Sequence, residues 1–109
     1  MEMEIEVYKT ASGKQPFNNW LNKIKETYTK VRILSRLDRL KLGNFGDCKA
    51  LDGGIYELRI HYGPGMRVYY AKKGTKIVLL LCGGDKGSQK RDIKRAKLYL
   101  EDYKTKERR

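Results

Sequence analysis

The sequence has few of the residues that hold transition metals or form covalent cross-links. It contains one histidine and two cysteines among 109 residues. Cys48 and Cys82 do not form a CxxC pair, and we interpret them as reduced, largely inert thiols. With a single histidine, no ligand spacing indicates a zinc site. We therefore expect neither a metal site nor a cofactor.

The chain also lacks a long apolar run. No stretch of about 18 apolar residues is present, so no membrane-spanning helix is expected. The first ten residues, MEMEIEVYKT, alternate acidic and apolar side chains, whereas a signal peptide begins with basic residues followed by an apolar core. These absences predict a cytoplasmic protein that is not embedded in a membrane.

Acidic residues are few in comparison with basic ones. The chain has 25 Lys and Arg against 13 Asp and Glu, which gives a formal net charge of +12. A surface of this charge attracts polyanions, so nucleic acid, an anionic membrane surface and an acidic protein are the candidate partners. Composition alone does not choose between them.

Length and hydrophobic periodicity predict one α+β domain over residues 1–109. The expected elements, in chain order, are a strand over 3–8, a helix from Pro16, a helix over about 28–42, strands over 55–62, 66–73 and 76–82, and a helix over about 88–103. Short glycine-bearing links join the last three strands, so these strands should pair as antiparallel hairpins. The order β-α-α-β-β-β-α indicates an antiparallel sheet with an N-terminal helical hairpin on one face. Residues 104–109 are expected to form a frayed basic tail.

The segment LLLCGGDKGSQKRDI, residues 79–93, has two interpretations. In the structural one, Gly83 and Gly84 end a strand that is buried on both faces, and Gly87 or Ser88 caps the next helix. In the functional one, Lys86 and the amides at the helix N-terminus face an anion. The pattern GxxxxGK[ST] is absent, so nucleotide hydrolysis of the Walker type is not expected.

Polar side chains share one face of two neighbouring strands. Strand parity places Glu57, Arg59 and His61 on one face of the 55–62 strand, and it places Arg67 and Tyr69 together on the next strand. Because a tight turn joins these strands, the five side chains should gather on one face of the sheet. These side chains are suited to contact RNA. The alternative is that they form a solvated face in which Glu57 makes a cross-strand ion pair.

Two of the expected helices carry rows of basic residues. Arg32, Arg36 and Arg39 follow a spacing of i, i+4 and i+7, which gives one basic stripe. Lys90 and Lys94 lie on one face of the C-terminal helix. Each row is either a solvated face or a contact to nucleic-acid phosphates.

Together, these motifs resemble those of a known family. The stretches ELRIHYGPGMRVYY and LLLCGGDKGSQKRDIKRAK resemble the HigB-like addiction module killer proteins of the RelE/ParE toxin superfamily. The ordered combination of ELR, GPG-x-RVYY, LLCGGDK and DI-x-x-A carries the resemblance, which covers nearly the whole chain. It implies a compact α+β toxin encoded beside a small antitoxin that usually contains a helix-turn-helix. Members of RelE and HigB type are ribosome-dependent, metal-independent mRNA endoribonucleases, whereas ParE-type members poison DNA gyrase with the same fold.

The resemblance gives the polar residues expected roles in RNA cleavage. In RNA cleavage the 2′-hydroxyl attacks the phosphate, and arginine and lysine side chains can hold the negative charge of the phosphorane that forms. Histidine is the side chain whose ordinary pKa suits proton transfer near neutrality. Tyr69 is expected to act through a hydrogen bond or by stacking on a base. RelE and HigB enzymes carry a catalytic Tyr or His near the C-terminus, and the segment DKGSQKRD contains neither. The catalytic candidates are therefore Arg59, His61, Arg67, Tyr69, Asp85 and Lys86.

The leading hypothesis is a toxin that cleaves mRNA on the ribosome and thereby inhibits translation. Its cognate antitoxin is expected to neutralise it through an acidic segment that contacts the basic surface, and operator DNA would be reached only through that antitoxin. The alternatives are a non-enzymatic ParE-like gyrase inhibitor and a non-toxic basic RNA-binding protein. The sequence does not separate these hypotheses.

Overall fold

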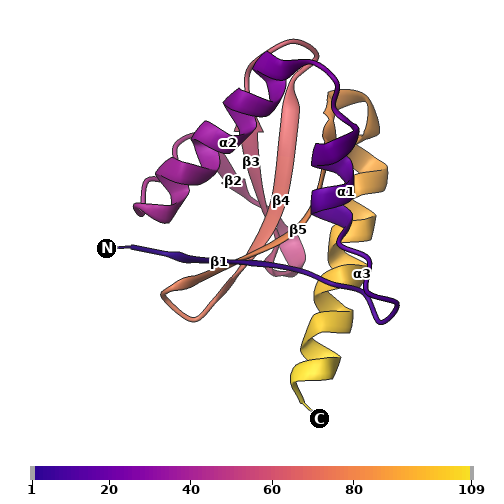
Figure 1. Cartoon of the computed structure of the whole chain (residues 1–109). Helices are drawn as coiled ribbons and strands as arrows, with labels where there is room; N and C mark the ends of the chain where they lie inside the picture. The colour runs from indigo at the N-terminus through magenta and orange to yellow at the C-terminus, as the bar shows by residue number, and fades with distance from the viewer. Residues whose placement is uncertain (1, 109) are drawn as a thin grey trace.

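A computed structural model describes residues 2–108 of the chain. Its elements run in the order β1 (Glu4–Val7), α1 (Pro16–Lys23), α2 (Thr27–Lys41), β2 (Cys48–Ala50), β3 (Tyr56–Ile60), β4 (Met66–Lys73), β5 (Ile77–Asp85) and α3 (Gln89–Glu107) (Figure 1). Pro16 occupies the first turn of α1, as its fixed φ angle and missing N–H favour. The predicted α+β class is confirmed. Among the described residues, no helix combines the length and the apolar character that a membrane crossing requires.

The strands form one five-stranded sheet in the order β1-β5-β4-β3-β2. The predicted hairpins β3–β4 and β4–β5 are antiparallel, and β2 adds antiparallel to β3. The expectation of a wholly antiparallel sheet was wrong at β1, which pairs parallel to β5 with Glu4 opposite Ile77. An alternating pattern shows which face of an edge strand is buried, but the route of the chain through α1 and α2 sets its direction. The β2 strand was missed because three residues are too few to show alternation.

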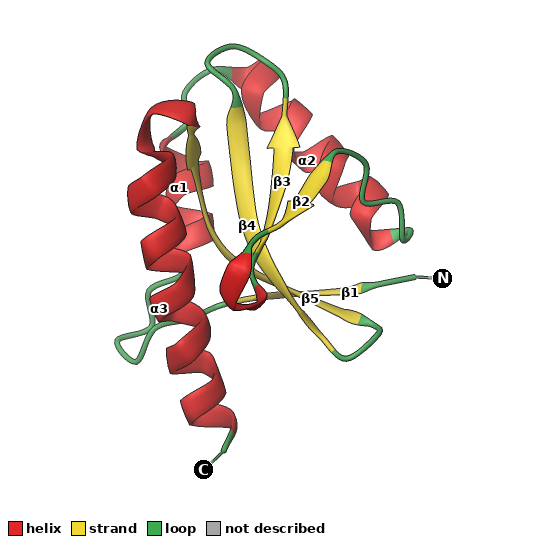
Figure 2. Cartoon of the chain, turned by 180° about the vertical axis from the view of Figure 1, so that it is seen from behind, coloured by secondary structure: helices red, strands yellow, loops and turns green. Residues whose placement is uncertain are grey.

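The helices cover the two faces of the sheet as separate layers. Helices α1 and α2 lie on one face, where they diverge from their short link, and α3 crosses the other face (Figures 1 and 2). The core under α1 and α2 contains Phe17, Ile33, Leu37, Leu40, Leu58, Ile60, Val68, Tyr70, Val78 and Leu80. The core under α3 contains Tyr8, Ile55, Tyr69, Ala71, Leu79, Leu81, Cys82, Ala96 and Leu100. The prediction that the last strand is covered on both faces is confirmed.

The two glycines of β5 allow helices to approach the strand from both sides. We expected Gly83 and Gly84 to end the strand, and this was wrong because β5 continues through both to Asp85. A Cβ atom at Gly83 would overlap the ring of Trp20 in α1, and one at Gly84 would overlap the carboxylate of Asp92 in α3. These positions need glycine for close packing rather than for a turn.

Helix α3 is longer than the sequence pattern indicates. It continues to Glu107, so the expected fraying was wrong for residues 104–107. Lys73 of β4 donates a hydrogen bond to the Tyr103 hydroxyl at 2.9 Å and also pairs with the Glu107 carboxylate. These contacts tie the last turns of α3 to the sheet, and Arg109 lies outside the described residues.

Candidate functional site

The ends of β3 and β5 and the start of β4 meet at one end of the sheet. Register pairs Ile60 with Met66 and Met66 with Asp85, and the Lys86 N–H donates to the Gly65 carbonyl at 3.0 Å. These contacts border a concavity of about 440 Å³, lined by residues 59–67 and Lys86. We call it the strand-end hollow. It brings together four of the catalytic candidates, namely Arg59, His61, Arg67 and Lys86.

A buried glutamate lies beneath the arginines of this hollow. Glu57 is 0% exposed, and its Oε1 accepts a hydrogen bond from Arg59 Nε at 2.9 Å. Its Oε2 accepts from Gln89 Nε2 at 2.8 Å and from the Tyr69 hydroxyl at 3.2 Å, and Arg67 Nε lies 3.5 Å away. The cross-strand ion pair considered from the sequence is present, but it lies under α3 and not on a solvated face.

Electrostatics keep Glu57 ionised and leave the hollow positive. Burial raises the pKa of Glu57, but hydrogen bonds from Arg59 and Gln89 and the charge of Arg67 outweigh it, so the pKa is lowered overall. Among the described residues, the buried Arg67 Nε has no hydrogen-bond partner. The hollow thus has three positive charges, from Arg59, Arg67 and Lys86, against the single negative charge of the carboxylate beneath them. This excess of positive charge suits an anionic ligand.

His61 lies at the mouth of the hollow and not inside it. Its imidazole is 75% exposed and donates through Nε2 to the Asp47 carboxylate. This hydrogen bond lowers the pKa of Asp47, which fixes a negative charge beside the ring. His61 and Ile60 also line a second concavity of about 240 Å³ with Arg32 and Arg39 of α2. The basic stripe of α2 therefore continues into the strand-end hollow.

Three of the predicted site residues have structural contacts instead. Tyr69 is fully buried, and burial together with the Glu57 charge raises its pKa, so it is a neutral donor that cannot stack on a base. The Asp85 side chain accepts the Ser88 N–H at 3.2 Å and braces the β5–α3 turn. Arg36 donates to the backbone carbonyls of Arg59 and Phe45 at 2.5 and 3.0 Å, which occupies its guanidinium.

The remaining predicted contacts lie on the outside of α3. Lys90 and Lys94 are exposed, and neither lines the strand-end hollow. Gln89 lies at the site and was missed, because nothing in its sequence position shows that its amide reaches Glu57. The importance of Glu57 was also missed, although its shared parity with Arg59 was a usable signal.

The fold and the basic hollow define a small α+β protein of RelE-like architecture. Residues 19–108 match the family described as phage derived protein Gp49-like (DUF891), and the chain belongs to that family. This toxin-like family is related to RelE and HigB, is associated with toxin–antitoxin systems and implies an antitoxin partner. A protein of Haemophilus influenzae (strain ATCC 51907 / DSM 11121 / KW20 / Rd), described as uncharacterized, is 49% identical over 86 residues, which cover 79% of this chain and 87% of that protein.

Proposed function

We propose that this protein is a HigB-like toxin that cleaves mRNA on the ribosome. The observation that supports the proposal most directly is the strand-end hollow, where Arg59, Arg67 and Lys86 converge from three elements of the chain. Guanidinium groups match the geometry of a phosphate, and a buried carboxylate holds both arginines in place. Membership of the Gp49-like family supports the toxin role.

The chemistry requires one proton acceptor, one proton donor and a site for negative charge. The ribose 2′-oxygen attacks the adjacent phosphorus in line as its proton is removed, and the bond from phosphorus to the 5′-oxygen breaks as that oxygen gains a proton. The products are a 2′,3′-cyclic phosphate and a free 5′-hydroxyl. Arg59, Arg67 and Lys86 would stabilise the phosphorane, because fixed cations act where the charge develops. His61, oriented by Asp47, is the side chain at the mouth suited to one proton transfer.

The proposal is tested by inducing the chain alone and measuring protein synthesis and mRNA ends together. Cleavage on the ribosome predicts a rapid stop in translation and new mRNA 5′ ends. Continued translation with DNA damage and filamentation would contradict it and indicate a gyrase inhibitor. Growth without any defect would leave only a non-toxic RNA-binding role.

The matched variant is Arg59→Lys with Arg67→Lys. Lysine keeps the charge beside Glu57 but loses the bidentate geometry, so the fold should persist while cleavage falls about 100-fold. Alanine is unsuitable at these positions, because it would leave a buried carboxylate without its partners. Circular dichroism checks the fold, and full activity in the lysine variant would count against these roles.

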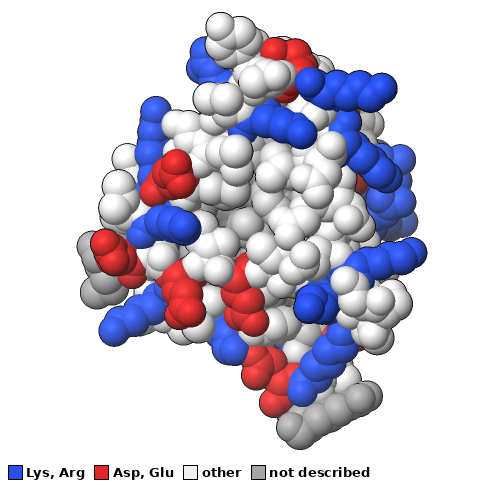
Figure 3. Space-filling view, in the orientation of Figure 1, with Lys and Arg blue, Asp and Glu red and all other residues white. Residues whose placement is uncertain are grey.

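We further propose that the antitoxin contacts the basic surface through an acidic segment. In the view of Figure 3, Lys and Arg side chains gather along the upper and right-hand edges, and most acidic side chains lie toward the lower left. With a net charge of +12, this surface favours an acidic partner and speeds its association.

A further inference from the structure

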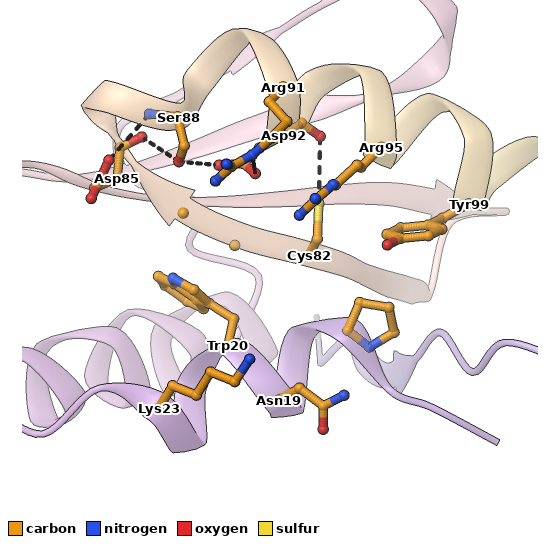
Figure 4. Close-up of a pocket in the computed structure, with 13 residues that line it drawn as sticks. Asn19, Trp20, Lys23, Cys82, Asp85, Ser88, Arg91, Asp92, Arg95 and Tyr99 are labelled. Atoms are coloured by element: carbon orange, nitrogen blue, oxygen red, sulfur yellow. Dashed lines mark hydrogen bonds and ion pairs between the residues drawn. The ribbon is translucent and has the colours of Figure 1, made fainter. Parts of the chain in front are cut away.

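Another basic concavity, apart from the two already described, lies between α1 and α3. Its volume is about 380 Å³, and its floor is the backbone of residues 82–85 of β5 (Figure 4). Lys23 and Trp20 of α1 form one wall, and Arg91 and Arg95 of α3 form the other. We call it the interhelix cleft. The cations proposed above for phosphate binding do not line it.

The floor of the cleft is bare backbone for a steric reason. At Gly83 the edge of the Trp20 ring occupies the space of a Cβ atom, and at Gly84 the Asp92 carboxylate does so. Asp92 is 3% exposed and accepts a hydrogen bond from the Ser88 hydroxyl. These contacts fix α1 and α3 against the strand, so the cleft between them is preformed.

Among residues 2–108, two cations in the cleft form no ion pair or hydrogen bond. Lys23 and Arg95 extend toward each other across the opening in Figure 4. Over residues 2–108, no hydrogen bond or ion pair engages either side chain. Arg91 Nε lies 3.8 Å from the Asp92 carboxylate, and the other acid of the lining, Asp85, already accepts the Ser88 N–H. Lys23 and Arg95 are therefore the cations available to a ligand.

The neighbourhood of the cleft indicates which anion it takes. Asp85 lines the interhelix cleft and the next residue, Lys86, lines the strand-end hollow, so one turn of the chain separates the two sites. A nucleic-acid strand with one phosphate in the hollow would carry its neighbouring phosphates along this turn. The Trp20 ring adds an aromatic surface beside the cations, as in other sites for single-stranded nucleic acid.

We infer that the interhelix cleft binds a flanking phosphate of the same RNA strand that the strand-end hollow holds. Lys23 and Arg95 contact this phosphate, and an unpaired base of the strand lies against Trp20. The inference rests on the proposed function, because it assigns a second contact to the same substrate. It extends the RNA footprint from the ends of β3 and β4 to the groove between α1 and α3.

Trp20 gives a direct readout, because it is the only tryptophan in the sequence. The probe is an end-labelled 2′-O-methyl RNA octamer, which binds but cannot be cleaved. We expect a saturable change in Trp20 fluorescence with the same midpoint as the anisotropy of the label. In Lys23→Ala/Arg95→Ala, affinity should fall about tenfold, and the slope of log K against log salt should become shallower by about 0.7, the value for one lost phosphate contact on a single strand.

The control removes the same charge from exposed sites elsewhere. Lys49→Ala/Lys76→Ala, on β2 and the β4–β5 turn, should change affinity less than about twofold. Unchanged affinity in the cleft variant, or RNA binding without a change in Trp20 emission, would overturn the inference. A glutamate-rich peptide that alters Trp20 emission at lower concentration than RNA does would also overturn it and identify a protein-docking cleft.

Cleavage of unmodified mRNA on ribosomes is measured separately, so the two proposals can fail independently. RNA binding that depends on Lys23 and Arg95 but is not followed by cleavage would reject the proposed function and keep the cleft assignment. Cleavage by wild type together with unaltered RNA binding by the cleft variant would reject the cleft assignment alone. If the octamer does not bind to the wild-type protein, the cleft assignment is rejected whatever the cleavage assay shows.

Discussion

Among single residues, Glu57 determines how the strand-end hollow is built. It is a buried charge whose four side-chain contacts come from β3, β4 and α3. Burial makes such a carboxylate costly unless it is paired, so its contacts constrain the arginines as much as they stabilise the fold. Arg59 and Arg67 are thus preorganised on the face that α3 covers, and both line the hollow.

Replacing this carboxylate should be costly. In Glu57→Gln, Arg59 and Arg67 lose their shared counter-charge in a buried setting, and we expect the free energy of unfolding to fall by about 3 kcal/mol. Urea denaturation followed by circular dichroism measures the change. Glu101→Gln, at an exposed position of α3, is the control and should change stability by less than about 0.5 kcal/mol. Equal stability of the two variants would contradict the role given to Glu57.

The lowered pKa of Glu57 also predicts a pH dependence. A carboxyl group with a lower pKa in the folded state than in the unfolded state stabilises the fold above its unfolded pKa, about 4.3 for Glu. That stabilisation is lost as the pH falls from this value through the folded pKa. As the pH falls below about 5, the free energy of unfolding should therefore decrease more steeply for wild type than for Glu57→Gln. Urea midpoints measured at successive pH values would show the difference. Parallel curves for the two proteins would refute this assignment.

Among the elements, the end of β5 positions both proposed sites. The strand passes through Gly83 and Gly84 between two helices, and its last residues turn into α3 beside the hollow. In the segment LLLCGGDKGSQKRDI, the expectation that the glycines end the strand was wrong, and the interpretation of Lys86 as an anion contact stays a prediction. Its glycines serve packing, and its charged residues border two basic concavities.

The close approach at this strand can be tested by adding one methyl group. In Gly84→Ala, the new Cβ meets the Asp92 carboxylate, which a hydrogen bond from the Ser88 hydroxyl holds in place, so overpacking should cost about 2 kcal/mol. Gly87→Ala is the comparison, because its Cβ would lie 3.2 Å from a single Asp85 oxygen. Thermal unfolding should show a clearly lower midpoint for Gly84→Ala. A loss no larger than that of Gly87→Ala would show that α3 can shift away.

At the scale of the whole molecule, charge governs association. The net charge is +12, and in the face that Figure 3 shows, many Lys and Arg side chains lie along the upper and right-hand edges. A surface of this kind attracts polyanions, and the proposed RNA and acidic antitoxin segment would both be drawn by the same long-range force. Both interactions should respond to ionic strength, which screens exposed charges beyond about 10 Å at 0.1 M salt.

The antitoxin contact can therefore be checked with salt. The protein encoded beside this chain should bind it more weakly and associate more slowly as NaCl rises from 0.05 to 0.5 M, because counter-charges on the basic surface become screened. Titration calorimetry and stopped-flow association measure the two effects. An affinity independent of salt would mean that apolar contacts, rather than an acidic segment, hold the complex.

The sequence predicted much of the fold because its periodicities are local. Alternation marked the strands and placed Arg59 and Arg67 on one face, and a tight glycine turn made those strands neighbours. The direction of β1 and the depth of Tyr69 were not predicted, because both depend on elements distant in the chain. Helix periodicity likewise showed a stripe containing Arg36, but not the loop carbonyls that bind its guanidinium.

The sequence alone determined the order of the elements, the excess of positive charge and the shared face of the strand arginines, because each follows from neighbouring residues and their spacing. Only the tertiary structure decided that α3 covers Glu57 and that Lys23 faces Arg95 across a glycine floor. These features join segments far apart in the chain, and packing between helices and sheet fixes them. The shared face of the two strand arginines was therefore predictable from the sequence, whereas the interhelix cleft required the folded chain.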